Sequence, residues 1–379
     1  MMFKNESGKI IRFLFEFMIF SVILCVLVIC IVIFIASYLG YEIKVEENEN
    51  NQIEMVVYRK KVKDNENRTD EPIDIYIQND LNLDDENLNN SIGIENSYFY
   101  NQLDEYGKIF YEKIIANSES LKSGDFVIVF NNEFNQLLSN GGDEQLKNSY
   151  KNAVDCIRYD RIDLFYIDFT KMYLKIETTT RGNDVSYKVF IEKGDNEINY
   201  YIDGIENREN LDYLLGLIEQ KKNEIISNTD GSNYQKILQV HDYLVDNLSY
   251  DETYNEINND NIIGAFLEGR VVCEGYSKAF KYLLDGLEIP CILVIGDAIN
   301  STGTMEKHMW NYVQINDKWY AVDVTWDDPI LIGKATLSDE SRYKYFCRKS
   351  DFNDNHYSDG VISVNGTKFI YPDLVENES

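Results

Sequence analysis

The sequence predicts an α+β protein with antiparallel sheets, and three patterns indicate this. Segments at residues 97–115, 146–160, 208–227 and 234–251 place apolar side chains at helical spacing. Short β-branched and aromatic runs between residues 164 and 204 are separated by turn sequences, which is typical of an antiparallel meander. Further along, a predicted helix over residues 274–287 is followed by two strands that share a tight turn at Asn316 and Asp317.

The first expected element is a membrane helix. Residues 17–36 carry no charged side chain, and twenty helical residues at about 1.5 Å each span the roughly 30 Å hydrocarbon layer. We predict an uncleaved transmembrane signal anchor over residues 17–37, with a cleaved signal peptide and a buried core helix as the alternatives. Basic residues precede this segment and acidic residues follow it, so residues 1–16 are expected in the cytoplasm. The bulk of the chain then lies outside the cytoplasm, as in a single-pass protein of the cell membrane.

Three regions are expected beyond the helix. Residues 42–95 are acidic and rich in asparagine, a composition that buries too little apolar surface to fold, so we predict a stalk with a possible strand at 53–62. Residues 96–230 are predicted to form an α+β accessory domain, with strands at 164–169, 172–180, 185–193 and 198–204. A second domain is predicted over residues 232–373, and a tail from Leu374 is expected to fray.

Charge and cysteine content exclude several classes of protein. The formal net charge is −29, and residues 1–41 hold three basic and two acidic groups, so nearly all of it lies beyond them. Nucleic acid is therefore not an expected partner, because its binding needs a basic patch. The cysteines lack paired spacing, so we predict no disulfide scaffold, metal site or cofactor. They are Cys25 and Cys30 in the apolar run, and Cys156, Cys273, Cys291 and Cys347 outside it.

Cys273 is the candidate nucleophile, because it precedes the predicted helix Glu274 to Leu287 directly. The amides and the dipole at a helix N-terminus stabilise an anion, so this position favours the thiolate that attacks acyl groups. The backbone N–H of Cys273 could also hold the oxyanion of a tetrahedral intermediate. A buried structural cysteine is the alternative, and it is our interpretation of Cys291 and Cys347.

His308 and Asp323 are predicted on one face of two neighbouring strands, 308–315 and 318–325. A two-residue turn pairs Trp310 with Asp323, which makes His308 and Asp323 diagonal neighbours about 7–8 Å apart at Cα. A slip of one residue would send the two side chains to opposite faces. In this arrangement His308 takes and returns the proton of the thiol, and Asp323 orients the imidazole.

Other aspartates and histidines are less favoured as members of the predicted triad. Asp327 and Asp328 are alternative orienters, but they follow the predicted strand and read more naturally as turn residues. His241 lies in an amphipathic helix and His356 in a polar C-terminal loop. We interpret both histidines as structural or solvated.

The segments CEGYSKAF, HMWN and DVTWDDP, preceded by HDYLVDNLSYD, resemble the transglutaminase-like superfamily in their order Cys, His, Asp and in their intervals of 35 and 15 residues. The resemblance covers residues 234–330. It implies a papain-related α+β core, in which the helix of Cys273 packs on an antiparallel sheet that carries His308 and Asp323. Animal transglutaminases stabilise the oxyanion with a tryptophan upstream of the cysteine, whereas here every tryptophan lies downstream. Tyr250 is the best upstream substitute, and an aromatic residue that packs after a helix is the alternative interpretation. The calcium dependence of some animal members is not implied.

The expected function is a membrane-anchored extracytoplasmic thiol enzyme that forms a thioester on peptide or amide substrates, such as wall peptides or surface proteins. If water accepts the acyl group, the enzyme is a peptidase or amidase, which we favour slightly. If an amine accepts it, the enzyme is a cross-linking protein-glutamine transamidase. A non-catalytic surface binding or assembly module on the same scaffold is the third interpretation, because fold alone does not determine function.

Overall fold

The computed structural model describes residues 41–47, 53–59, 97–181, 184–300, 302–328, 338–358, 360–364 and 367–375. The chain divides into two units, Met1–Leu81 and Asn82–Ser379, which are described separately. The predicted cytoplasmic segment and signal anchor, residues 1–37, lie outside the described residues. Within the residues that are described, no helix has the length and apolar character needed to cross a membrane.

The first unit contains an antiparallel hairpin of β1 (Tyr41–Glu47) and β2 (Ile53–Arg59), in which Tyr41 pairs with Arg59. Strand β2 coincides with the possible strand considered at residues 53–62. Strand β1 and the pairing were not predicted, because the overall polarity of residues 42–95 favoured a segment without structure. The alternation of apolar and charged residues in YEIKVEE is the local signal for a strand.

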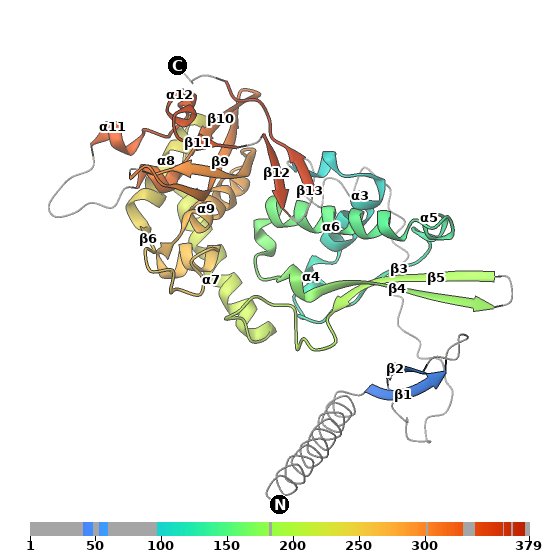
Figure 1. Ribbon diagram of the computed structural model, residues 1–379. Coiled ribbons are helices and arrows are strands. Elements are labelled where there is room, and N and C mark those ends of the chain that lie inside the picture. The colour runs from blue at the N-terminus through green and yellow to red at the C-terminus, as the bar shows by residue number, and fades with distance from the viewer. Residues whose placement is uncertain are drawn as a thin grey trace, which may run out of the picture. The chain divides into compact units, whose positions relative to one another are not determined.

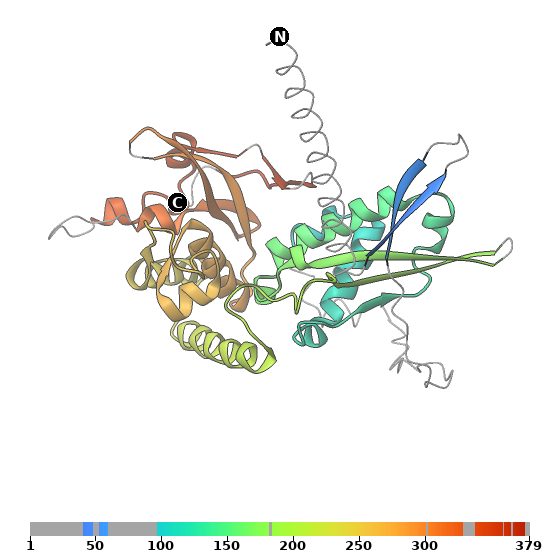
Figure 2. The same cartoon turned by 60° about the horizontal axis from the view of Figure 1, so that its bottom comes forward.

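The second unit begins with helices and a three-stranded sheet. The long helices are α3 (Glu105–Ala116) and α6 (Asp143–Asp160), which pack together. Strands β3 (Ile128–Phe130), β4 (Met172–Arg181) and β5 (Asp184–Lys193) form an antiparallel sheet in the order β3-β5-β4. Because β3 pairs only with residues 189–191 of β5, the β4–β5 hairpin extends well beyond it (Figures 1 and 2). The shorter elements are η2 (Tyr100–Gln102), α4 (Ser118–Leu121), α5 (Asn135–Ser139), η3 (Ile162–Leu164) and η4 (Phe169–Lys171).

The predicted meander is wrong at both ends, since residues 164–169 and 198–204 are not strands. Only an isolated bridge joins these segments, at Ile167 and Tyr201. The tyrosines of the second segment are buried, and their hydroxyls are held by backbone groups: Tyr200 donates to the carbonyl of Leu121 at 2.9 Å and Tyr201 to that of Lys122 at 2.6 Å. Aromatic burial, rather than sheet pairing, therefore explains the strand-like composition.

The two long helices that precede Cys273 follow the sequence prediction. Helix α7 spans Arg208–Ser227 and α8 spans Asn233–Asn247. Ser232 begins α8 with a capping box, in which its hydroxyl accepts from the backbone of Gln235 and the Gln235 side chain accepts from the backbone of Ser232. Two very short strands, β6 (Ser249–Tyr250) and β7 (Arg270–Val271), pair in parallel, and η5 (Gly264–Glu268) lies between them.

A four-stranded antiparallel sheet supports the candidate site. Its strands are β8 (Cys291–Ile299), β9 (Met305–Ile315), β10 (Lys318–Val322) and β11 (His356–Tyr357), in the order β10-β9-β8-β11. Helix α9 (Cys273–Gly286) packs against β8 and β9, as the resemblance implied (Figure 1). The remaining elements are α10 (Val324–Asp327), α11 (Asp339–Arg342), α12 (Lys349–Asn353), β12 (Val361–Val364) and β13 (Thr367–Ile370).

The turn between β9 and β10 has the predicted register. Asn316 and Asp317 have φ values of 50° and 61°, as a type I′ turn requires, and Lys318 pairs with Ile315. The second strand is shorter than predicted, because it ends at Val322. Asp323 instead begins α10, and its side chain accepts hydrogen bonds from the first amides of that helix. This local capping bond competes with the strand and ends it.

The C-terminal segment is tied to both halves of this unit. The backbone of Ile370 on β13 exchanges two hydrogen bonds with the Gln102 amide, at 2.9 and 2.7 Å. Leu374 pairs with Trp319, and the Val375 amide donates to the Trp319 carbonyl at 3.1 Å. Leu374 and Val375, which were expected to fray, are therefore paired, and the rest of the predicted tail lies outside the described residues. The described residues of the two predicted domains, 96–230 and 232–373, pack together within one unit.

Candidate active site

Cys273 is the first residue of α9, as predicted, and its thiol is half-buried and free. No side chain caps this end of the helix, so the first amides remain available to an anion. Gly275 allows the close approach of the first turn to the preceding loop. A Cβ there would lie 2.6 Å from the Asn259 carbonyl oxygen and 2.5 Å from the Val271 side chain.

Two buried hydrogen bonds fix α9 against the strand that carries His308. The Ser277 hydroxyl donates to the Met309 carbonyl at 3.0 Å, and the Asn311 amide donates to the Ser277 carbonyl at 3.1 Å. Unpaired polar groups are costly in a core, so these bonds hold helix and strand in one register. They explain the serine of CEGYS and the asparagine of HMWN in structural terms.

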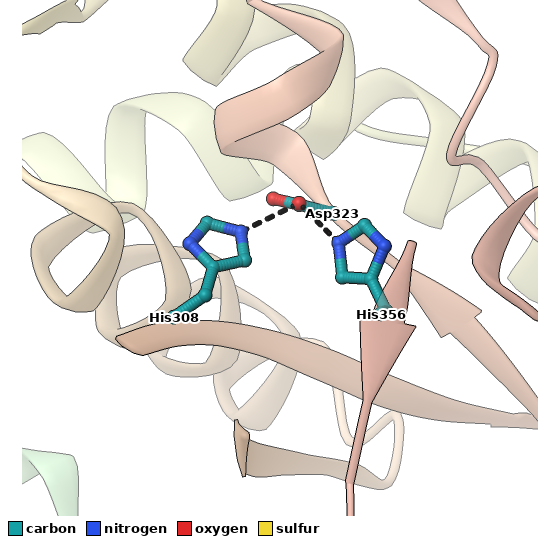
Figure 3. A group of neighbouring side chains, drawn as sticks. All are labelled: His308, Asp323 and His356. Carbon is teal, nitrogen blue, oxygen red and sulfur yellow. Dashed lines mark hydrogen bonds and ion pairs between the residues drawn. The ribbon is translucent and has the colours of Figure 1, made fainter. Parts of the chain in front are cut away.

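His308 and Asp323 are in direct contact, although Asp323 lies at the start of α10 and not on a strand. His308 Nε2 lies 2.7 Å from Asp323 Oδ2, and both residues are buried (Figure 3). The other oxygen of Asp323 accepts from the amides of Thr325 at 3.0 Å and Trp326 at 3.2 Å. Because the two amides fix the carboxylate and the carboxylate holds the imidazole, the orientation of His308 is set by the fold.

His308 and Asp323 each stabilise the charged form of the other. Burial disfavours the imidazolium, but the charge and hydrogen bond of Asp323, together with smaller contributions from Cys273, raise the pKa of His308 to about 10. Burial likewise disfavours the carboxylate of Asp323, but His308 and His356 hold its pKa below the ordinary value. The preferred state of this pair is therefore an imidazolium beside a carboxylate.

Two tryptophans enclose the His308 ring. The Trp310 ring stacks on it at a centroid distance of 6.0 Å and an angle of 27°, and the Trp326 ring lies at 5.1 Å and 32°. These contacts exclude water from the ring faces, which strengthens the interaction with Asp323. Gly296 on β8 pairs with His308 and leaves room for this packing, since a Cβ there would lie 2.5 Å from the Trp310 ring.

His356 is the residue that sequence reasoning missed. It lies on β11, is buried, and places its Nε2 3.0 Å from Asp323 Oδ2, so two histidines share one carboxylate oxygen (Figure 3). Its polar neighbours had predicted a loop. Instead His356 lies in a strand, because β11 pairs with β8 at the sheet edge. Burial outweighs Asp323 here and holds the pKa of His356 below its usual value. The scarcity of histidine in the chain was the only signal that could have drawn attention to it.

The alternative orienters pair elsewhere. Asp327 Oδ2 lies 3.1 Å from Nε2 of the buried His241, and Asp328 accepts a hydrogen bond from the Tyr276 hydroxyl at 2.6 Å. Burial raises the pKa of both carboxyls to about 6, against the opposing effect of these partners. His241 is therefore structural, as predicted, and the two aspartates anchor α10 rather than orient His308.

Tyr250, the upstream oxyanion candidate, lies on β6. Its hydroxyl is 3.3 Å from that of Tyr254, which has a φ of 54°. Burial is the main cause that raises the pKa of Tyr250, and the charge of Cys273 adds to it. The phenol therefore stays neutral and can donate a hydrogen bond near the thiol.

Three donor atoms of the site could in principle hold a metal ion, since those of His308, Asp323 and His356 lie within 4.8 Å of one another. However, the two N–O distances, 2.7 and 3.0 Å, are those of hydrogen bonds. The carboxylate also accepts two backbone amides through its other oxygen. We therefore interpret this group as a hydrogen-bonded cluster.

A cavity of about 420 Å³ opens beside α9. Its walls come from residues 158–203 and from residues 257–278, so neither of the two predicted domains forms it alone. Glu274, which directly follows Cys273, lines one side. Representative lining residues are Arg158, Phe165, Phe169, Ile257, Glu274 and Lys278.

Comparison with known proteins agrees with this arrangement. Residues 220–324 match the model of the Transglutaminase-like superfamily, and this range contains Cys273, His308 and Asp323. The chain therefore contains a domain of the transglutaminase-like superfamily. No curated protein sequence matches the chain.

Several solved structures are similar over part of the chain. A TGase matches with 16% identity and a TM-score of 0.28, over 46% of this chain and 50% of its own. A proposed cysteine protease from Cytophaga hutchinsonii matches with 14% identity and a TM-score of 0.24, over 40% of this chain and 62% of its own. The periplasmic domain of TgpA from Pseudomonas aeruginosa matches with 13% identity and a TM-score of 0.23, over 38% of this chain and 55% of its own. The chain thus spans about half the length of the first of these structures.

The raised pKa of His308 predicts an unusual pH dependence for cleavage of an amide. The leaving amine needs a proton from the imidazolium, so turnover should stay high through neutral pH and fall as pH passes about 10. Alkylation of Cys273 needs only the thiolate and should not fall over the same range. Rates of ammonia release and of iodoacetamide labelling between about pH 6 and 11 would check this. A decline in amide turnover centred near the ordinary pKa of histidine would contradict it.

Proposed function

We propose that the chain is a thiol enzyme in which Cys273, His308 and Asp323 form a catalytic triad, acting on peptide or amide substrates. The observation that carries this proposal is the buried 2.7 Å contact between His308 and Asp323, in which Cys273 also contributes to the raised pKa of His308. A histidine held by a carboxylate and coupled to a thiol at a helix N-terminus has the parts that acyl transfer needs.

The reaction has two steps in this proposal. The Cys273 thiolate attacks the carbonyl carbon, a C–S bond forms, and the C–N bond breaks as the His308 imidazolium gives its proton to the leaving amine. An acceptor then attacks the thioester, His308 takes the acceptor's proton, and the C–S bond breaks to restore the thiolate. Asp323 keeps the imidazole oriented and stabilises its charge in both steps.

Tyr250 is the proposed side-chain donor to the oxyanion, alongside the backbone N–H of Cys273. Replacement of Tyr250 by phenylalanine should slow acylation by p-nitrophenyl acetate by about a hundredfold, because one preorganised donor is lost. Alkylation by iodoacetamide forms no oxyanion, so its rate at Cys273 should be unchanged and serves as the control. Equal acylation rates in the wild type and the variant would remove Tyr250 from this role.

The acceptor decides which enzyme this is. We favour water, which makes the protein a peptidase or amidase, and keep an amine, which makes it a cross-linking transamidase, as the alternative. The apolar run at residues 17–37 supports a single-pass anchor with residues 1–16 in the cytoplasm and the catalytic domain outside it. Peptides of the cell wall or proteins of the cell surface are then the accessible substrates.

One experiment separates these functions. The purified full-length chain is incubated with glutamine-containing peptides and a labelled primary amine, with the Cys273→Ala variant in parallel. Peptide cleavage or ammonia release without label supports the hydrolase, whereas incorporated label supports the transamidase. If neither product depends on Cys273 and its thiol is no more reactive than a free one, the chain is a binding or assembly module on the same scaffold.

A further inference from the structure

His356 has a position that a merely structural histidine does not need. Its Nε2 lies 3.0 Å from the same Asp323 oxygen that Nε2 of His308 contacts at 2.7 Å. Both rings reach this oxygen from different strands, β11 and β9, as Figure 3 shows. With the amides of Thr325 and Trp326 on the other oxygen, the carboxylate accepts four hydrogen bonds and is completely buried.

The ring of His356 is enclosed by aromatic side chains and has a polar partner at each nitrogen. Four aromatic rings lie around its ring, with centroid distances from 4.5 to 5.1 Å: Trp310, Trp326, Tyr345 and Phe352. In this apolar enclosure burial holds the pKa of His356 below its ordinary value. Nε2 of His356 faces a carboxylate oxygen and therefore donates to Asp323, while Nδ1 lies 2.8 Å from the side-chain oxygen of Asn355. His356 thus gives the Asp323 carboxylate a fourth hydrogen bond, on the oxygen that His308 also contacts.

We propose that His356 is a positioning residue of the thiol site, which holds the Asp323 carboxylate ionised and aimed at His308. This inference rests on the proposed function of the triad and extends it to a fourth side chain. Without this donor, Asp323 keeps its bonds to His308, Thr325 and Trp326, but a carboxylate this deeply buried is harder to keep ionised. The imidazolium of His308 is then less stabilised by Asp323. The Cys273 thiolate is in turn less stabilised by His308.

The charged and titratable groups that face the two histidines are few among the described residues. Cys273 on α9 acts on His308, and Asp323 at the start of α10 acts on both rings. Asp327, at the other end of α10, acts on Asp323. Lys344 opposes a positive charge on His356, and the Tyr345 hydroxyl reaches His356 through Asn355. Asp323 is thus the carboxylate that both histidines contact directly.

The test uses three variants and measures the rate at which iodoacetamide alkylates Cys273 as a function of pH. His356→Phe keeps an aromatic ring and removes the donor, so alkylation at mildly acidic pH should slow by about ten- to a hundredfold, with the acid limb moved to higher pH. His356→Gln places an amide near the position of Nε2 and should restore the wild-type profile. His356→Asn places its amide nearer the position of Nδ1 and should behave as His356→Phe does.

His241→Phe is the matched control, because it also removes a buried histidine that contacts an aspartate, at 3.1 Å, but away from Asp323. Its Cys273 profile should follow the wild type even if its melting temperature falls. If His356→Phe does not fold, the Gln and Asn variants still decide the matter. An unshifted acid limb in His356→Phe, or equal profiles for Gln and Asn, would overturn this proposal alone. A wild-type Cys273 no more reactive than free cysteine would overturn the proposed function with it.

Discussion

Replacement of His308 by alanine is expected to lower the turnover of glutamine-containing peptides by about 10⁴-fold or more. In the proposed mechanism the variant loses the group that gives a proton to the leaving amine and takes one from the acceptor. The 2.7 Å contact of Nε2 with Asp323 holds this imidazole in one orientation, which alanine cannot reproduce. Initial rates of ammonia release measure the loss.

His241→Ala is the control for this prediction. His241 is equally buried, and its Nε2 contacts a carboxylate at 3.1 Å, but that carboxylate is Asp327. The control should lose stability and keep turnover within about threefold of the wild type, since changes outside the reacting groups act mainly on folding. Comparable losses of turnover in the two variants would indicate that His308 is a structural residue.

Replacement of Asp323 by asparagine is expected to lower turnover by about 10³- to 10⁴-fold. The amide can still accept from Thr325 and Trp326 through its oxygen, so α10 keeps its cap. Its nitrogen then points at His308 and donates, which forces the proton of the imidazole onto Nδ1, the side of the thiol. The base is therefore in the wrong tautomer. His356 Nε2 faces the same nitrogen, so it must accept there and carry its proton on Nδ1, beside the Asn355 oxygen.

Asp327→Asn provides the matched comparison, because it makes the same chemical change at the other end of α10. Its partner is His241, so turnover should remain close to that of the wild type while the melting temperature falls. Full turnover in Asp323→Asn would contradict the assignment of Asp323 as orienter. The turnover of both variants is measured at one pH, and folding is checked by circular dichroism. This comparison separates the effect of the lost charge on turnover from its effect on stability.

The sequence predicted the parts of the site that depend on local patterns. The apolar spacing after Cys273 predicted α9, and the turn at Asn316 and Asp317 predicted the register of β9 and β10. Both are confirmed, because each depends on residues close together in the chain. The contact of His308 with Asp323 was predicted on a longer strand than the one that forms, since the Asp323 side chain caps α10 and ends β10.

The features that the sequence did not predict depend on contacts between segments that are distant in the chain. His356 reaches Asp323 because a two-residue strand, β11, pairs with β8 at the sheet edge, and two residues carry no periodic signal. The tyrosine-rich segment at residues 198–204 resembled a strand because burial and strand formation select the same aromatic residues. Asp327 and Asp328 were assigned to a turn, whereas the fold uses them to bind His241 and Tyr276.

The most direct test of the central claim, a thiol activated by His308 and Asp323, is the rate at which iodoacetamide alkylates Cys273 across pH. Cys156, Cys291 and Cys347 are buried, so a comparison with them would measure access, and free cysteine is the proper reference. We predict that wild-type Cys273 reacts faster than free cysteine below neutral pH, and that His308→Ala and Asp323→Asn lose this advantage. A wild-type rate that follows free cysteine at every pH, unchanged in both variants, would contradict the proposed triad.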